Sequence, residues 1–157
     1  MDKPRSMLDW VFEGVSCVAL LAAIGDVAMR WSRLPERIPV HFGASGNPNR
    51  WGGRNMLLLL VATTVVMAAL LTLAEKHQRF INIPISVDRE SPEVRRLLRS
   101  MVIVMKAAIT LAFLWIVDAT MRVALGELNG LGPASLPMFL GGVFAPMVYY
   151  LVKLKRL

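Results

Sequence analysis

The chain has 157 residues, 55% of them hydrophobic, and a formal net charge of +7. Soluble domains are usually about 45–50% apolar, whereas the mean hydropathy here is positive, at +0.53. This composition excludes an ordinary soluble domain and indicates a membrane protein. The positive charge lies near the ends of apolar runs, so it favours contact with lipid headgroups over nucleic acid binding.

Four apolar segments are long enough to cross a bilayer, which takes roughly 20 helical residues. They cover approximately residues 10–31, 55–73, 101–125 and 136–152. Because lipid offers no partners to backbone N–H and C=O groups, each segment must be helical. We therefore predict an all-α integral membrane protein with four transmembrane helices. These form one domain over residues 1–157, with an ordered extracytoplasmic loop between the first two helices.

The first segment follows Lys3, as the apolar part of a signal peptide would follow its basic residues. Its length and the acidic residues Glu13 and Asp26 favour a retained helix instead. Cys17 is the only cysteine, and we predict a small residue in a helix contact rather than a metal ligand. Glu13 and, in the third segment, Lys106 are expected to extend towards the membrane surface.

The basic residues predict the orientation of the helices. With a cytoplasmic N-terminus, twelve lysines and arginines, Lys3 among them, fall on the inside and six on the outside. Cytoplasmic segments carry the excess of basic residues in membrane proteins. We therefore predict a multi-pass protein of a prokaryotic cell (inner) membrane with both termini in the cytoplasm.

The outer loop, residues 33–54, reads "RLPERIPVHFGASGNPNRWGGR" and contains three prolines. Proline stiffens an extended chain. Ile38, Val40 and Phe42 alternate with Arg37, Pro39 and His41, which places them on one side of an extended segment. Glycine and asparagine then supply turns. The loop is predicted to be a folded cap over the outer end of the bundle.

His41 is the candidate for chemistry within this loop. It could act as a metal ligand, a proton acceptor or, when protonated, an anion contact. The other histidine, His77, is predicted at the opposite membrane face, and no second metal-binding residue stands at a useful spacing. We favour a histidine that locks the loop through hydrogen bonds, with ligand binding as the alternative.

Two helices end in a similar acid–base pattern, "AAIGDVAMRW" and "LWIVDATMRV". Asp26 and Arg30 match Asp118 and Arg122, and a spacing of four places each pair on one helix face. An internal repeat of two helices is one interpretation. A charge at membrane depth costs about 2.5–3.5 kcal/mol. We expect the four charges to converge in one polar cluster, with His41 reaching it from above. Two separate intrahelical pairs are the alternative.

The cytoplasmic connection, residues 76–100, contains a helix start at Ser91 and Pro92. Serine is a preferred N-cap, and proline is favoured in the first turn. Arg95, Arg96 and Arg99 would then lie on a cytoplasmic extension of the third helix, where they contact anionic headgroups.

The stretch "LPERIPVHFGASGNPNRWGG" resembles the signature of a membrane family called domain of unknown function 1648. The matching positions are Leu34, Pro35, Ile38, Pro39, His41, Phe42, Gly46 and Gly52. With "NIP" at 82–84, the resemblance covers roughly residues 8–105. The family is related to the N-terminal part of the Sdp immunity proteins, which protect a producer cell from a secreted antibacterial peptide. Immunity is therefore implied for the first half of the chain only.

No nucleophile beside a base, phosphate loop, dinucleotide fingerprint or zinc set is found. We therefore predict a non-catalytic protein that recognises a small or peptide ligand at the outer face, in an immunity, sensor or accessory role. Its binding residues would be His41, Asp26, Arg30, Asp118 and Arg122, without metal or cofactor. The expected partners are membrane lipids, such a ligand, and a second copy or a membrane protein, but no nucleic acid. A membrane enzyme or small transporter using His41 with Asp26 or Asp118 is the alternative.

Overall fold

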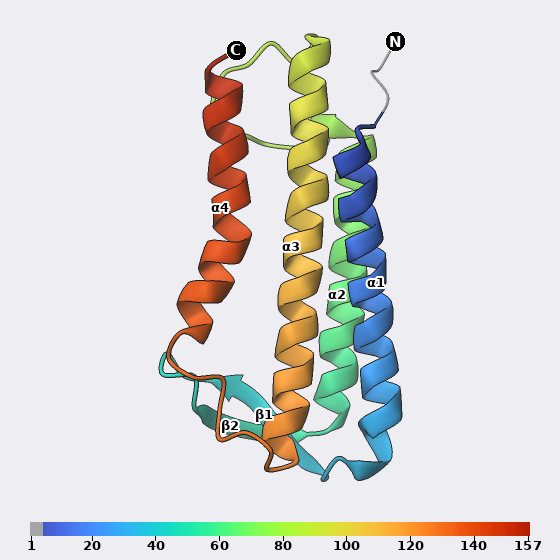
Figure 1. The fold of residues 1–157 in the computed structure, drawn as a ribbon, viewed down its shortest axis with the longest axis vertical. Helices are drawn as coiled ribbons and strands as arrows, with labels where there is room; N and C mark the ends of the chain where they lie inside the picture. Colours follow the sequence, from blue (N-terminus) through green and yellow to red (C-terminus); the bar gives the residue numbers. More distant parts are fainter. Residues whose placement is uncertain (1–4) are drawn as a thin grey trace.

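The computed structural model describes residues 5–157 and confirms four helices that are long and apolar enough to cross a membrane. The helices are α1 (Met7–Arg30), α2 (Asn55–Lys76), α3 (Pro92–Ala124) and α4 (Ser135–Lys155). The start of α1 and the end of α4 lie at one end of the bundle, and a small sheet lies at the other (Figure 1). Lys3, which entered the charge count, lies outside the described residues.

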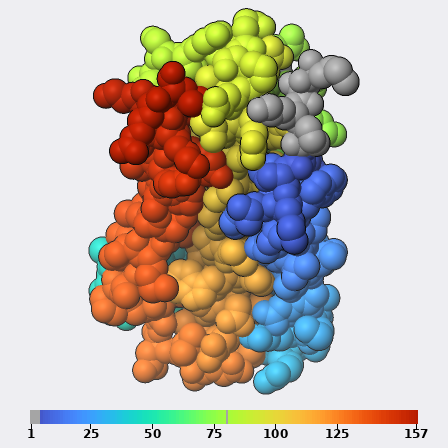
Figure 2. All heavy atoms as spheres, turned by 45° about the horizontal axis from the view of Figure 1, so that its top comes forward, coloured from blue at the N-terminus to red at the C-terminus, as the bar shows by residue number. Residues whose placement is uncertain are grey.

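Helix α3 is the central element of the bundle. It packs against α1, α2 and α4, and it holds most of the buried helical residues. On the face in Figure 2, α3 lies between α4 and α1. The outward faces of α1, α2 and α4 expose large apolar side chains, as helices in contact with lipid do. Cys17 lies on such an exposed surface, so its predicted place in a helix contact was wrong.

Local sequence explains where α1 and α3 begin. The Ser6 hydroxyl accepts a hydrogen bond from the Asp9 backbone N–H at 3.1 Å, and the Asp9 carboxylate accepts one from the Ser6 N–H at 2.9 Å. This reciprocal capping box satisfies two N–H groups at the helix start. The third helix begins with Ser91 as N-cap and Pro92 in its first turn, as predicted, so it extends well beyond its apolar span.

The predicted cap is a β-hairpin, an addition to the all-α expectation. Strands β1 (Arg37–Phe42) and β2 (Pro48–Gly53) are antiparallel. Pro39 pairs with Trp51 and His41 with Arg50, so Val40 has no partner of its own. Successive side chains of a strand normally lie on opposite faces. The extra residue at the bulge interrupts this alternation in β1. Pro39 is consequently buried and Val40 exposed, contrary to the predicted pattern.

The hairpin covers one end of the bundle through an apolar core. Ile38 is 2% exposed and Leu34 is 4% exposed. They belong to a buried cluster with one or two residues from each of three helices: Val27, Leu57, Val117 and Met121. Burial of two large side chains contributes about 1.5–3 kcal/mol each, so the loop is part of the folded domain.

The hairpin turn docks on the connection between α3 and α4. Gly46 has a φ of +79°, which favours glycine. Its carbonyl accepts a hydrogen bond from the Leu131 N–H at 2.8 Å. A Cβ atom at Gly46 would lie 2.2 Å from the Gly132 carbonyl oxygen. Both backbone conformation and lack of space therefore require glycine at this turn.

Replacing Gly46 with alanine is expected to weaken this docking by about 1–3 kcal/mol, the cost of a strained positive φ. Hydrogen exchange at the Leu131 amide should accelerate, because its acceptor moves away. Gly53→Ala is the matched control, since a Cβ there meets nothing within 4 Å. Equal exchange at Leu131 in the two variants would contradict the docking.

Candidate binding site at the hairpin end

A set of ion pairs joins α1 to α3 near the hairpin. Arg30 lies between two carboxylates: its Nε is 2.8 Å from Asp26 Oδ1, and its Nη1 is 3.0 Å from Asp118 Oδ1. Asp26 is on the same helix, one turn away, whereas Asp118 is on α3. The Arg30–Asp118 contact therefore links the two helices directly.

Arg122 extends the set along α3. Its Nη1 is 3.8 Å from Asp118 Oδ2, and its Nε is 3.6 Å from Glu127 Oε2. The structure thus brings the four predicted residues together and adds Glu127, which sequence reasoning missed. Glu127 follows the end of α3 in the stretch "GELNG", where an acidic residue in a turn gave little signal. We call the five residues the hairpin-end cluster: Asp26, Arg30, Asp118, Arg122 and Glu127.

The central members of the cluster are largely shielded by protein. The side chains of Arg30 and Asp118 are 28% and 29% exposed, and that of Asp26 is 17% exposed. The buried Arg30 Nη1 makes no geometrically acceptable hydrogen bond, although Asp118 Oδ1 lies 3.0 Å away. The contact between helices is therefore an ion pair held by charge attraction.

An open groove runs between α1 and α3 up to these charges. Its volume is about 650 Å³. The α1–α3 groove is lined by Ala22, Gly25, Asp26, Met29, Arg30, Leu111, Leu114, Trp115 and Asp118. Six of these residues are apolar, and the charged ones, two carboxylates and one guanidinium, sum to −1. This lining suits a ligand with an apolar body and a cationic or polar end.

His41 lies apart from the cluster. Its Nδ1 is 2.6 Å from the Asn49 side-chain oxygen on the facing strand. Within residues 5–157, no hydrogen bond or ion pair joins His41 to the cluster, so the structure does not bring it there. The bond to Asn49 matches the loop-locking interpretation. No group of three or more metal-binding side chains occurs in that part of the chain either.

The signature residues build the hairpin and its contact with the bundle. Leu34, Ile38 and Pro39 are buried, Phe42 is half-buried, and Pro35 is exposed. Gly46 makes the docked turn described above. Gly52 pairs with Ile38, and a Cβ there would lie 2.9 Å from a Val40 methyl group. The signature therefore encodes a structural cap.

A second buried charge set lies on the far side of the membrane span from the hairpin. Lys106 Nζ is 2.7 Å and 2.9 Å from the two Glu13 oxygens, 3.0 Å from Thr72 Oγ1 and 3.7 Å from Glu75 Oε2. Arg5 in turn contacts Glu75. Lys106 is 3% exposed, so its predicted extension to the surface was wrong. The sequence could have indicated this charge set, because each of three predicted helices carries a charged residue towards the same side of the membrane.

Four membrane-crossing helices, a hairpin cap and ion pairs between helices define a multi-pass membrane protein. Residues 17–70 match the family described as "Domain of unknown function (DUF1648)", which confirms the resemblance of the loop signature over these residues but not over the wider range of 8–105. An uncharacterized protein of Archaeoglobus fulgidus is 39% identical over 64 residues. This alignment covers 36% of the chain and 35% of the relative, so it spans about a third of the relative's length. No solved structure matches the chain significantly.

Proposed function

We propose that this protein recognises an amphipathic small or peptide ligand at the hairpin end, as a non-catalytic protein with an immunity, sensor or accessory role. One observation carries the proposal: the apolar α1–α3 groove ends at the ion pairs of Asp26, Arg30 and Asp118. A groove between lipid-exposed helices is reached from the membrane, where amphipathic molecules concentrate.

The charges of the groove select the polar end of the ligand. Its lining carries a net charge of −1, from Asp26 and Asp118 against Arg30. Trp115 on the same lining offers an aromatic face, which attracts cations. The ligand would place an ammonium or guanidinium group beside the two carboxylates and its apolar part along Leu111 and Leu114.

The alternative of an enzyme or transporter has less support. An enzyme that combined His41 with Asp26 or Asp118 would need them together, whereas His41 bonds to Asn49 on the hairpin. A transporter would need a polar path. Lys106 and Asp118 are about 18 Å apart along α3, and Thr110 is the one polar residue between them on that helix.

A leucine–lysine helical peptide should bind the full chain in nanodiscs and change the fluorescence of Trp115 in a saturable way. Phenylalanine replaces the other three tryptophans, Trp10, Trp31 and Trp51, so that Trp115 alone reports. Gly25 lines the groove, and a Cβ there meets nothing within 4 Å. Gly25→Leu should fill the groove and weaken binding about tenfold, which is about 1.4 kcal/mol.

Gly14→Leu is the matched control, because Gly14 is on the same helix, has equal space and does not line the groove. A peptide with glutamate in place of lysine should bind worse than the lysine peptide. Equal loss in the two glycine variants would place the peptide elsewhere. Equal binding of both peptides would remove the role of the carboxylates.

We also propose that the hairpin faces the outside of a prokaryotic cell membrane and that both termini are cytoplasmic, because the excess of basic residues lies at the opposite end. In a Cys17→Ser background, an impermeant thiol reagent should label Ser45→Cys in intact cells. Ser91→Cys should be labelled only after the membrane is opened. The reverse pattern would invert the topology.

A further inference from the structure

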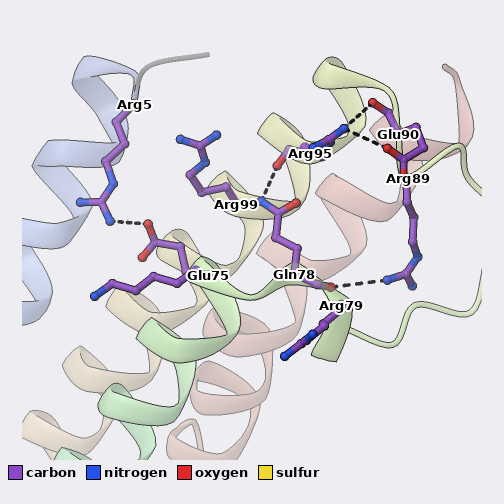
Figure 3. A pocket seen from close by; sticks show the side chains of 9 residues that line it. Arg5, Glu75, Gln78, Arg79, Arg89, Glu90, Arg95 and Arg99 are labelled. Carbon is purple, nitrogen blue, oxygen red and sulfur yellow. Dashed lines mark hydrogen bonds and ion pairs between the residues drawn. The ribbon is translucent and has the colours of Figure 1, made fainter. Parts of the chain in front are cut away.

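A pocket rich in arginine lies at the end of the bundle opposite the hairpin (Figure 3). Its volume is about 570 Å³. It forms where Arg5, the end of α2, the connection after α2 and the first turns of α3 meet. Six cationic side chains line it: Arg5, Lys76, Arg79, Arg89, Arg95 and Arg99. We call this the basic pocket.

The acids of the basic pocket do not balance its cations. Glu75 and Glu90 are its two carboxylates, so the lining carries six positive and two negative charges, a net +4. Both carboxylates already have cationic partners. Glu75 contacts Arg5 and lies 3.7 Å from Lys106 Nζ, and Glu90 Oε2 lies 3.2 Å from Arg95 Nη2.

Backbone carbonyl groups hold one of the arginines in place without neutralising it. Arg89 donates to the Ile81 carbonyl at 2.9 Å and to the Gln78 carbonyl at 3.4 Å. These bonds tie the connection after α2 to the pocket wall. They leave the positive charge of Arg89 in the pocket, because a carbonyl oxygen carries only a partial charge.

Arg99 and Lys76 supply the charge that is most available to a ligand. In Figure 3 the guanidinium of the half-buried Arg99 lies between Arg5 and Arg95. Neither Arg99 nor Lys76 has a carboxylate of residues 5–157 within ion-pair distance, although Asp9 lies close enough to attract the charge of Arg99. Like charges held close together repel one another, and a bound anion would relieve that repulsion.

The length of α2 places the basic pocket at the level of the lipid phosphates. Its 22 residues span about 33 Å, close to the roughly 30 Å of a hydrocarbon core. Lys76, at its end, therefore lies at the membrane surface. Trp10 lies at the same end, exposed, with the Arg5 guanidinium 4.8 Å from its ring centre. Exposed tryptophan is typical of the headgroup region.

We propose that the basic pocket binds a phosphate-bearing anion, with Arg99 and Lys76 as principal contacts. The phosphate comes either from the headgroup of an anionic lipid or from a free polyphosphate. An arginine guanidinium donates two parallel hydrogen bonds to phosphate oxygens, and lysine adds a point charge. The site is separate from the α1–α3 groove and does not depend on the function proposed for that groove.

Calorimetric titration of the full chain in a neutral detergent tests the proposal. One arm adds short-chain phosphatidylglycerol, with phosphatidylcholine of equal chain length as its control, and the other adds inorganic pyrophosphate. At least one of the two anions should bind with saturation. Binding of phosphatidylglycerol alone identifies a lipid site, whereas binding of pyrophosphate identifies a site for free phosphate.

Arg99→Gln should weaken binding of that anion about fivefold or more, as expected for one basic residue near phosphate. Lys76→Gln should do the same, and it keeps the test valid if Arg99→Gln does not fold, because Lys76 is exposed. Lys155→Gln is the control, since Lys155 is exposed at the same end of the bundle, on α4, and does not line the pocket. Absence of binding by both anions, or equal loss in Lys155→Gln, would overturn the proposal.

Discussion

Lys106→Met should destabilise the bundle by about 3 kcal/mol, because it leaves the shielded carboxylates of Glu13 and Glu75 with Arg5 as their remaining cation. The Lys106 and Glu75 side chains are each 3% exposed, and that of Glu13 is 18% exposed. Lys106 donates to both Glu13 oxygens and to Thr72. Methionine fills a similar volume, so the loss would come from charge and hydrogen bonding rather than from a cavity. Unfolding in mixed micelles measures the effect.

A second substitution, at a partner carboxylate of Lys106, separates the effect of charge on stability from the effect of packing. Adding Glu13→Gln to Lys106→Met should recover part of the stability, because it removes one of the stranded negative charges. Lys155→Met is the matched control: Lys155 is exposed at the end of α4, where a surface substitution usually changes stability by less than about 0.5 kcal/mol. Equal stability of Lys106→Met and Lys155→Met would show that the buried ion pairs contribute little.

The helices were predictable because the membrane imposes a simple rule on sequence. A spanning segment needs a length of apolar residues and must satisfy its own backbone groups. The start of α3 could be predicted from the pair Ser91 and Pro92, although the Ser91 side chain makes no capping hydrogen bond. The ion pairs among Asp26, Arg30, Asp118 and Arg122 could be predicted from the depth of these residues in the membrane. Charges near the same end of two parallel helices have few other partners.

The hairpin and the Lys106 network depend on contacts that no local pattern reveals. The sequence of β1 has the period of two that identifies strands, but the bulge at Val40 buries Pro39 and exposes Val40, which the alternation did not predict. Lys106 meets Glu13 from 93 residues away, on another helix. Which of several charges at similar depth face one another depends on the rotation of each helix, and packing along α3 decides that.

The ion pair between Arg30 on α1 and Asp118 on α3 should also contribute strongly to stability. Arg30→Gln and Asp118→Asn should each cost about 1–3 kcal/mol, since each removes a partner from a shielded charge. The double variant should cost less than the sum, with a coupling energy of about 0.5–3 kcal/mol. Unfolding in mixed micelles of the four proteins of the cycle gives the coupling. The exposed pair Arg33 and Glu127, with 4.0 Å between its charged atoms, should show weaker coupling.

A second double-mutant cycle, on Asp26 and Arg122, tests whether the hairpin-end cluster is coupled as a whole. Asp26 and Arg122 do not touch; Asp26 pairs with Arg30, Arg122 pairs with Asp118, and the contact between helices joins the two pairs. Asp26→Asn with Arg122→Gln should therefore be less than additive, but with a smaller coupling than Arg30 with Asp118. Strict additivity in both cycles would leave two independent intrahelical pairs. The α1–α3 groove would then lack a fixed charged end, and a ligand would have no defined position for its cationic group.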